Sequence, residues 1–356
     1  MRQTLALFAA LVCVLLALYP ERRVICWFEF FTDGLIPPSI SNKGQDVLSA
    51  LWLGGFENGH VDRGGRVSSA LAAFLRSSAQ TPAMVELAAG GGVASVKWAE
   101  ALRAEHGLEA RVLLTDLHPN LRAWERLQAR YGRELVDYVN ASVDATAVGA
   151  SLDSVRGGAA AGSSRPRLRL INFALHHFEP RVASAMVADA VSAGAGLLVG
   201  DLAPCVGGIL WNHILTQSYI PRVLRQQWGG PLGLVSDLPW WAVPLIPLAP
   251  LLAWHDATVS TLRAYSTDQI EEFVRAAPGG ESYVVEAYGG GRCSDLSDGG
   301  HFHWLLRGRA EAAGTFHSFE SASFGAWFGL PPALEAALPG MSAPVARFHF
   351  VRPSQA

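Results

Sequence analysis

The sequence predicts an α/β protein built on a doubly wound, largely parallel sheet. Short apolar runs of strand length alternate along the chain with segments of helix length, and acidic residues or glycines follow several of these runs. This alternation is typical of a parallel sheet covered by helices on both faces. Of the 356 residues, 50% are hydrophobic and 17% are charged, which excludes an intrinsically disordered chain. The formal net charge of −3 argues against a nucleic-acid-binding protein held by a general basic field.

The expected strands alternate with helices up to residue 201, except that a loop and no helix is expected between the third and fourth strands, and a further helix closes the series. The expected strands are residues 83–87, 111–116, 137–140, 168–173 and 196–201. The expected helices are residues 93–106, 120–131, 181–192 and 267–276. Residues 157–167 are small, polar and basic, which is typical of a surface loop.

Acidic residues and glycines gather where the first three strands end. Glu86 ends the first strand and the triglycine 90–92 follows; Asp116 ends the second strand, and Asp144 follows the third. Ligands of such sheets bind outside the carboxyl ends of the strands. Glycines there let a ligand approach the backbone and expose helix N–H groups, while Asp116 can accept both ribose hydroxyl hydrogens and Asp144 an exocyclic amine. The pattern predicts a nucleoside cofactor.

The same residues resemble the motifs of the class I S-adenosylmethionine-dependent methyltransferases. Residues 85–92, Val-Glu-Leu-Ala-Ala-Gly-Gly-Gly, resemble the first motif, with Ala88 in place of the first glycine. Residues 114–116 resemble the ribose-binding strand end, residues 143–145 the adenine-contacting loop, and residues 170–178 the fourth-strand motif of many small-molecule methyltransferases. The order of elements matches the family from about residue 81 to residue 309.

The resemblance implies a Rossmann-like methyltransferase sheet, a methyl-transfer activity and S-adenosyl-L-methionine as the cofactor. It also implies a closing antiparallel strand pair, at residues 282–288 and 301–306. The expected cofactor-binding residues are Glu86, Ala88, Gly90, Gly91, Gly92, Asp116, Leu117, Asp144, Ala145 and Asn172. Asn172 is expected at the methionine portion.

Two other functions remain open from the sequence. An NAD-dependent oxidoreductase is suggested by residues 90–95, which approximate a dinucleotide fingerprint with serine in place of the last glycine. Against it stand the acidic residue before the glycines, where a pyrophosphate must pass, and the lack of a recognisable second mononucleotide-binding half. A non-catalytic, membrane-tethered binding module with the same fold would present the same residues.

His176 and His177 are the candidate catalytic residues, because a hydroxyl or carboxyl acceptor gains from a nearby base. As continuations of an extended strand they are expected to point to opposite sides, so that at most one faces the site. The alternative is that they cap the strand and bond to backbone. No metal site is predicted, since the four cysteines lack ligand spacing and His301 and His303 lack an evident third ligand.

Two apolar stretches predict membrane association. Residues 4–19 carry no charge and are interpreted as an N-terminal anchor, with a cleaved signal or a buried helix as alternatives. Residues 204–255 hold few charges, and their uncharged part, 238–254, contains four prolines, which disfavours a straight span. That part is expected to lie at a membrane surface or to cover an apolar pocket. The acceptor is therefore expected to be a small, apolar or lipid-like molecule, with no nucleic acid involved.

The predicted organisation has four parts. Residues 1–23 form the hydrophobic anchor or signal, and residues 24–80 a helical segment over the cofactor. Residues 81–310 form the methyltransferase domain, with the apolar insertion 204–255 inside it. Residues 311–356 form a C-terminal tail that packs on the core or contacts a membrane.

Overall fold

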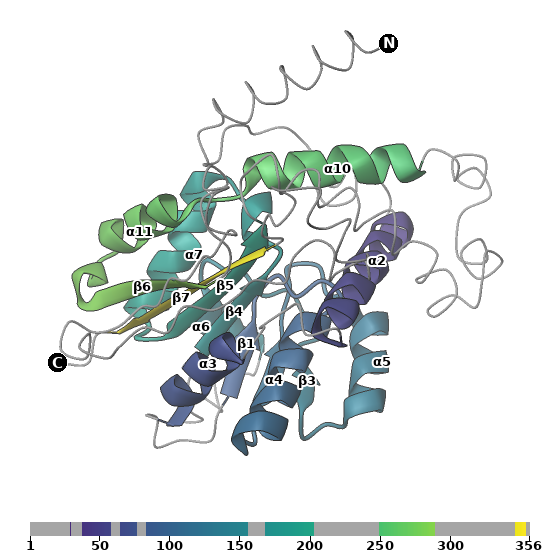
Figure 1. The fold of residues 1–356 in the computed structure, drawn as a ribbon, viewed down its shortest axis with the longest axis horizontal. Coiled ribbons are helices and arrows are strands. Elements are labelled where there is room, and N and C mark those ends of the chain that lie inside the picture. The colour runs from purple at the N-terminus through teal and green to yellow at the C-terminus, as the bar shows by residue number, and fades with distance from the viewer. Residues whose placement is uncertain are drawn as a thin grey trace, which may run out of the picture.

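A seven-stranded sheet organises the part of the chain that the computed structural model describes, residues 29, 38–57, 65–76, 83–155, 168–202, 249–288 and 346–353. The strand order is β3-β2-β1-β4-β5-β7-β6, and β7 is antiparallel to both of its neighbours while the first five strands are parallel. Figure 1 shows this sheet with helices around it. The predicted doubly wound α/β sheet with an antiparallel closing pair is confirmed.

The elements have the following bounds. The strands are β1 (Ala83–Glu86), β2 (Arg111–Leu114), β3 (Val136–Tyr138), β4 (Leu168–Asn172), β5 (Gly196–Leu202), β6 (Tyr283–Tyr288) and β7 (Ala346–Pro353). The α-helices are α2 (Pro38–Glu57), α3 (Arg66–Arg76), α4 (Val93–His106), α5 (Leu121–Tyr131), α6 (Val148–Val155), α7 (Pro180–Ser192), α10 (Ala249–Arg263) and α11 (Thr267–Ala276). Two short 3-10 helices are η1 (Leu175–His177) and η3 (Gly280–Ser282).

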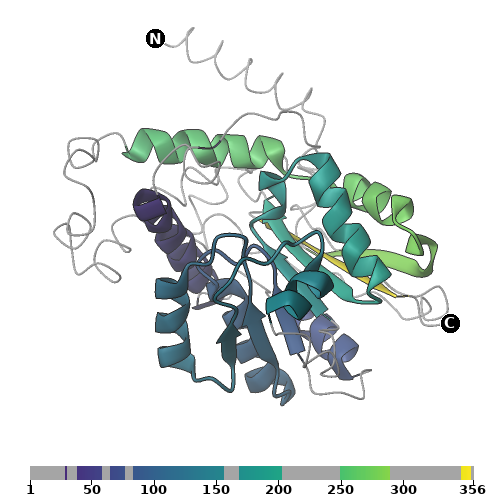
Figure 2. The same ribbon diagram turned by 180° about the vertical axis from the view of Figure 1, so that it is seen from behind.

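Helices cover both faces of the central strands. The two opposite views show α3 and α4 on one face and α6 and α7 on the other (Figures 1 and 2). Every residue of β4 and β5 is buried, as expected for strands enclosed between two helical layers. Trp98 of α4 and Met186 of α7 are completely buried and belong to one continuous core. Packing on both faces therefore fixes the positions of β4 and β5, including those of their carboxyl ends.

The expected antiparallel closing pair is present, with one strand where it was predicted. Residues 283–288 form β6, which pairs with β7. Residues 301–306, the predicted second strand, lie outside the described residues. Strand β7 lies between β5 and β6 and pairs with both. The end of the predicted tail is therefore part of the sheet.

The two apolar stretches are described only in small part. Residues 4–19, where the anchor is predicted, lie outside the described residues, as do residues 203–248. Within the described ranges, no helix combines the length and the apolar character that crossing a membrane requires. Helix α10 begins inside the predicted insertion, with Pro250 in its first turn, where proline removes no intrahelical hydrogen bond.

Helix α2 lies over the glycine turn that follows β1. Gln45 of α2 accepts a hydrogen bond from Asn120 Nδ2 (2.6 Å), and Asp46 forms an ion pair with Arg126 (3.0 Å), which ties α2 to α5. A Cβ atom added to Gly91 would lie 2.1 Å from Ser49 Oγ of the same helix. The missing side chain of Gly91 thus allows α2 to approach the turn.

We expect Gly91→Ala to destabilise the fold by about 1–3 kcal/mol, because the new methyl group forces α2 away from the turn. The double variant Gly91→Ala/Ser49→Ala removes the atom that is contacted most closely, Ser49 Oγ, and should recover part of the loss. Urea unfolding of the two single variants and the double variant measures the coupling between these positions. Strictly additive effects would show that the close approach of α2 is not what requires glycine here.

Candidate functional site

Glu86 and Asn172 meet at the carboxyl ends of two adjacent strands, β1 and β4. Asn172 Nδ2 donates to Glu86 Oε1 at 3.0 Å and to Ser95 Oγ at 3.1 Å. The two halves of the sheet, β3-β2-β1 and β4-β5, meet between β1 and β4, where the strand order reverses. Folds of this kind bind ligands at that switch point, so Glu86 and Asn172 are called the switch-point pair. Both residues are buried.

Each member of the switch-point pair has one buried acceptor atom with no hydrogen-bond partner among the described residues, Glu86 Oε2 and Asn172 Oδ1. Leaving a buried acceptor unsatisfied costs about 1–3 kcal/mol. The pKa of Glu86 is raised to about 8, mainly by burial and in smaller part by the negative charge of Asp116. The hydrogen bonds from Asn172 and Ser95 oppose this rise. A ligand that brings N–H donors and a positive charge would satisfy both acceptors and favour the carboxylate.

The glycine turn and Asp116 form the second part of the site. Asp116 Oδ2 accepts from the backbone N–H of Gly90 (2.9 Å), and Oδ1 accepts from that of His118 (2.8 Å). Burial raises the pKa of Asp116, and these two N–H groups oppose the rise. Each carboxylate oxygen has a further acceptor position, so Asp116 can still bind a hydroxyl group. The indole of Trp124 donates to Gly90 O (2.9 Å) and holds the turn from the other side.

The turn itself runs through left-handed backbone. Ala88 has a φ of 50°, Gly90 of 49° and Gly92 of 74°. Glycine adopts this region at little cost, whereas alanine is strained there, so Ala88 fits this backbone less well than the glycine of the motif that it resembles. Gly92 is also the N-cap residue of α4 and lies where a Cβ would be 2.7 Å from Leu114 Cδ1.

The residues expected at the adenine end lie beside Asp116. The N–H of Val143 donates to Asp116 O (2.9 Å), which joins the loop after β3 to the end of β2. Asp144 is exposed, and its Oδ1 accepts from the N–H and hydroxyl of Thr146. Ala145 is half-buried and Leu117 is 53% exposed. The structure therefore brings the expected cofactor-binding residues to one edge of the sheet, with Asp144 and Leu117 at its open end.

His176 and His177 do not point to opposite sides, as the strand-end interpretation predicted. They lie in the 3-10 turn η1, and their ring centroids are 4.0 Å apart. Asp201, near the end of β5, fixes this turn because it accepts the backbone N–H of His176 (3.0 Å) and contacts its ring Nδ1 (2.5 Å). A 3-10 turn places successive side chains about a third of a turn apart and not on opposite faces, so both rings face one group.

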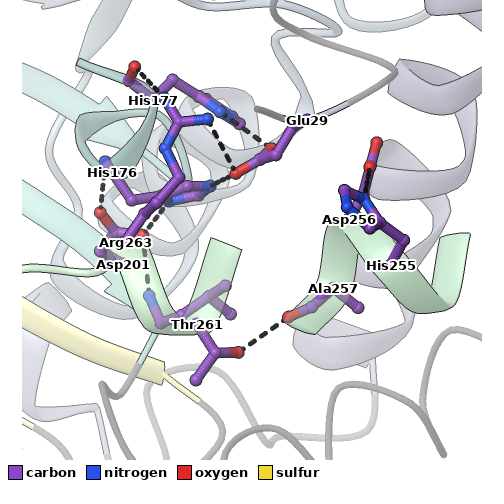
Figure 3. A network of polar contacts seen from close by, with 10 residues as sticks. Glu29, His176, His177, Asp201, His255, Asp256, Ala257, Thr261 and Arg263 are labelled. Carbon is purple, nitrogen blue, oxygen red and sulfur yellow. Dashed lines mark hydrogen bonds and ion pairs between the residues drawn. The ribbon is translucent and has the colours of Figure 1, made fainter. Parts of the chain in front are cut away.

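That group is Glu29, which sequence reasoning missed. Its Oε2 lies 3.1 Å from His177 Nδ1, and its Oε1 lies 3.9 Å from His176 Nε2 and 3.6 Å from Arg263 Nη1. Figure 3 shows the Glu29 side chain directed at both rings, with Arg263 beside it. Arg263 Nη2 also donates to His177 O (2.6 Å), which holds α10 against η1. Glu29, His176, His177, Asp201 and Arg263 are called the histidine cluster below.

Charge within the histidine cluster shifts two pKa values. Burial alone would raise the pKa of Glu29, but the nearby His177, His176 and Arg263 outweigh burial and hold it well below its usual range. Burial alone would lower the pKa of His176, but the Asp201 carboxylate outweighs burial and raises it. The cluster is thus a network of charged or polar groups at the carboxyl ends of β4 and β5.

Comparisons with known proteins concern the fold. No family model matches the chain, and no curated protein matches it. Solved structures that resemble it include an O-methyltransferase family protein from Burkholderia thailandensis, with 15% identity and a TM-score of 0.30 over 61% of this chain and 52% of that one. A putative O-methyltransferase from Nostoc punctiforme PCC 73102 has 14% identity and a TM-score of 0.31 over 67% of this chain and 62% of that one.

A third similar structure is an N-methyltransferase from Haemonchus contortus in complex with phosphomonomethylethanolamine and S-adenosylhomocysteine. It has 12% identity and a TM-score of 0.37 over 92% of this chain and 60% of that one. The chain thus covers less than two thirds of the length of each of these three proteins.

Proposed function

We propose that this chain is a class I S-adenosylmethionine-dependent methyltransferase acting on a small, apolar or lipid-like acceptor at or near a membrane. The observation that carries the proposal is the switch-point pair. Its two buried acceptor atoms, Glu86 Oε2 and Asn172 Oδ1, receive no hydrogen bond from any of the described residues. The methionine portion of the cofactor ends in an ammonium group, which supplies N–H donors and a positive charge at once. Such a group fits the pair better than a phosphate does, because both Asn172 donors are already used.

The other residues at this edge fit the rest of the cofactor. Asp116 is placed to hold the ribose hydroxyl groups, and Asp144 with Ala145 and Leu117 to border the adenine. The backbone of residues 90–92 supports the methionine portion. When bound, the cofactor supplies a sulfonium-activated methyl group, so that the protein contributes chiefly alignment and a site for the acceptor.

The histidine cluster is the proposed acceptor site. His177 is the better placed of the two expected bases, because its side chain is 19% exposed while that of His176 is 3% exposed. Helix α10, which contacts η1, carries two large apolar side chains that are exposed, Leu251 (64%) and Trp254 (55%). These exposed side chains on the helix that carries Arg263 support an apolar acceptor.

The activity is tested by incubating the protein with isotopically labelled S-adenosylmethionine and a membrane-lipid extract, followed by mass analysis of the products. We expect labelled methyl groups in small, lipid-like molecules, and we expect S-adenosylhomocysteine to suppress them as a competing product. Label found only in protein or RNA would contradict the proposed acceptor class. A reduced or oxidised product that depends on NADH would favour the oxidoreductase alternative.

Attachment to the membrane is proposed to depend mainly on residues 4–19 and to a smaller degree on residues 238–254. Burial of sixteen uncharged, largely apolar residues is strongly favourable, whereas a proline-broken interfacial segment adds a weaker, reversible contribution. Deletion of residues 1–20 should therefore release most of the protein from cell membranes after a carbonate wash. A truncated protein that stays bound would move the main anchor elsewhere, and a full-length protein found wholly in the soluble fraction would contradict attachment.

A further inference from the structure

The side chains of Glu29, His176 and His177 bring three metal-ligand atoms together. The three atoms lie within 4.8 Å of one another, and the two imidazoles come from η1 while the carboxylate comes from a distant part of the sequence. Two ligands of a tetrahedral zinc ion, each at about 2.0–2.1 Å, are roughly 3.3 Å apart. The shortest carboxylate contacts of the two rings lie on either side of that value: 3.1 Å from Glu29 Oε2 to His177 Nδ1 and 3.9 Å from Glu29 Oε1 to His176 Nε2. Small movements of these side chains would therefore form a coordination shell.

The surroundings of His176 match those of a metal-binding histidine. Asp201 holds the Nδ1 side of the ring (2.5 Å) and also accepts the backbone N–H groups of His176 (3.0 Å) and Leu202 (2.8 Å). The ring is thereby oriented with Nε2 toward Glu29. A carboxylate bound to the far nitrogen of a ligating histidine is the usual second contact in zinc sites, where it fixes the tautomer and the ring orientation.

The charges around the three ligands also accommodate a cation. Glu29 and Asp201 are acidic, and Arg263 is the basic side chain beside them, so with neutral imidazoles these five residues sum to one negative charge. Arg263 approaches Glu29 Oε1 at 3.6 Å and donates to His177 O, so its contact with the carboxylate is on the oxygen that is not the one beside His177 Nδ1. Two imidazoles and one carboxylate form the ligand set of catalytic zinc and of non-haem iron sites, which keep positions open for substrate.

We propose that Glu29, His176 and His177 bind a divalent transition-metal ion, with zinc as the best-matched candidate, and that its open position takes an oxygen atom of the acceptor. This second part rests on the proposed methyltransferase function. An acceptor hydroxyl bound at the ion would be more acidic and would lose its proton to solvent water. Its oxygen would then form a bond to the methyl carbon while the sulfur–methyl bond breaks and its electron pair passes to sulfur. The two imidazoles then act as ligands and not as bases.

Metal binding is tested first by calorimetric titration of the chelator-treated full-length protein with Zn²⁺, and by the visible absorption spectrum of the protein loaded with Co²⁺. We expect one ion per chain and the strong absorption of a four-coordinate Co²⁺ site. Glu29→Gln and His177→Ala should abolish binding, and Asp201→Asn should weaken it about 10- to 100-fold without changing the stoichiometry. His255→Ala changes a histidine of α10 that is not one of the three proposed ligands; it is the matched control and should bind as the wild type does.

Titration of each variant with S-adenosylmethionine shows whether the cofactor site is still folded and separates this proposal from the proposed function. Wild-type protein that binds S-adenosylmethionine but no metal ion would overturn the metal site. Protein that binds the ion but no S-adenosylmethionine would leave the metal site standing and contradict the methyltransferase. Acetohydroxamate, an oxygen ligand, should change the Co²⁺ spectrum, and an unchanged spectrum would overturn the open position for an acceptor oxygen.

Discussion

Glu86→Gln is expected to weaken S-adenosylmethionine binding about 10- to 100-fold, because a charge-assisted hydrogen bond to the ligand ammonium contributes about 1.5–3 kcal/mol. Glutamine keeps the size of the side chain and can still accept from Asn172, so the substitution removes mainly the charge. Glu125→Gln is the matched control, since Glu125 is exposed on α5. Calorimetric titration of the three proteins at pH 8 measures the effect, and equal affinities would contradict a contact between Glu86 and the cofactor.

The same carboxyl predicts how binding depends on pH. In the free protein its pKa is raised to about 8, so at neutral pH Glu86 is largely protonated, and an ammonium ligand must displace that proton to pair with the carboxylate. Affinity should therefore rise with pH toward about 8, by at most about tenfold per pH unit, and the slope should be lost in Glu86→Gln. A wild-type affinity that stays constant or falls over this interval would contradict the assignment.

Stability should show the opposite dependence in the absence of ligand. Between pH 4.5 and about 8 the folded chain retains a proton at Glu86 that the unfolded chain has lost. The unfolded state then binds fewer protons, so the contribution of Glu86 to the free energy of unfolding decreases as pH rises through this interval. Urea unfolding of Glu86→Gln should show less of this decrease than the wild type.

Asp116→Ala is expected to reduce S-adenosylmethionine affinity about 30- to 150-fold, from the loss of both ribose contacts at about 2–3 kcal/mol. The substitution also removes the acceptor that fixes Gly90 N–H, so the glycine turn loses one of its ties. Asp137→Ala is the matched control, because Asp137 is a partly exposed carboxylate in an ion pair with Arg111 at the surface. Titration of both variants compares them, and an unchanged affinity in Asp116→Ala would remove the ribose assignment.

The central part of the fold was predictable because its signals are local. Helix α4 begins and ends at the predicted residues, since glycines in left-handed conformation flank it at Gly92 and Gly107. The strand ends that carry Glu86, Asp116 and Asn172 were likewise predictable, because parallel strands present their carboxyl ends at one edge. Helix α6, of eight residues, was not predicted, because so short a helix shows too little periodicity.

The histidine cluster was only half predictable. The adjacent pair His176 and His177 is visible in the sequence, but its 3-10 conformation depends on hydrogen bonds to Asp201 of β5. Glu29 lies far upstream, and no local pattern connects it with the pair; only the folded chain brings it within 3.1 Å of His177 Nδ1. The need for glycine at position 91 was assigned to ligand approach, while the structure adds the contact with Ser49 of α2.

The most direct measurement is calorimetric titration of the full-length wild-type protein with S-adenosylmethionine and, separately, with NADH, in two pH 7 buffers that differ in ionisation enthalpy. One molecule of S-adenosylmethionine should bind per chain, and the difference between the buffers should show that a proton is released, because Glu86 becomes a carboxylate when the ammonium binds. No detectable binding of S-adenosylmethionine, or binding of NADH in preference to it, would contradict the proposed function.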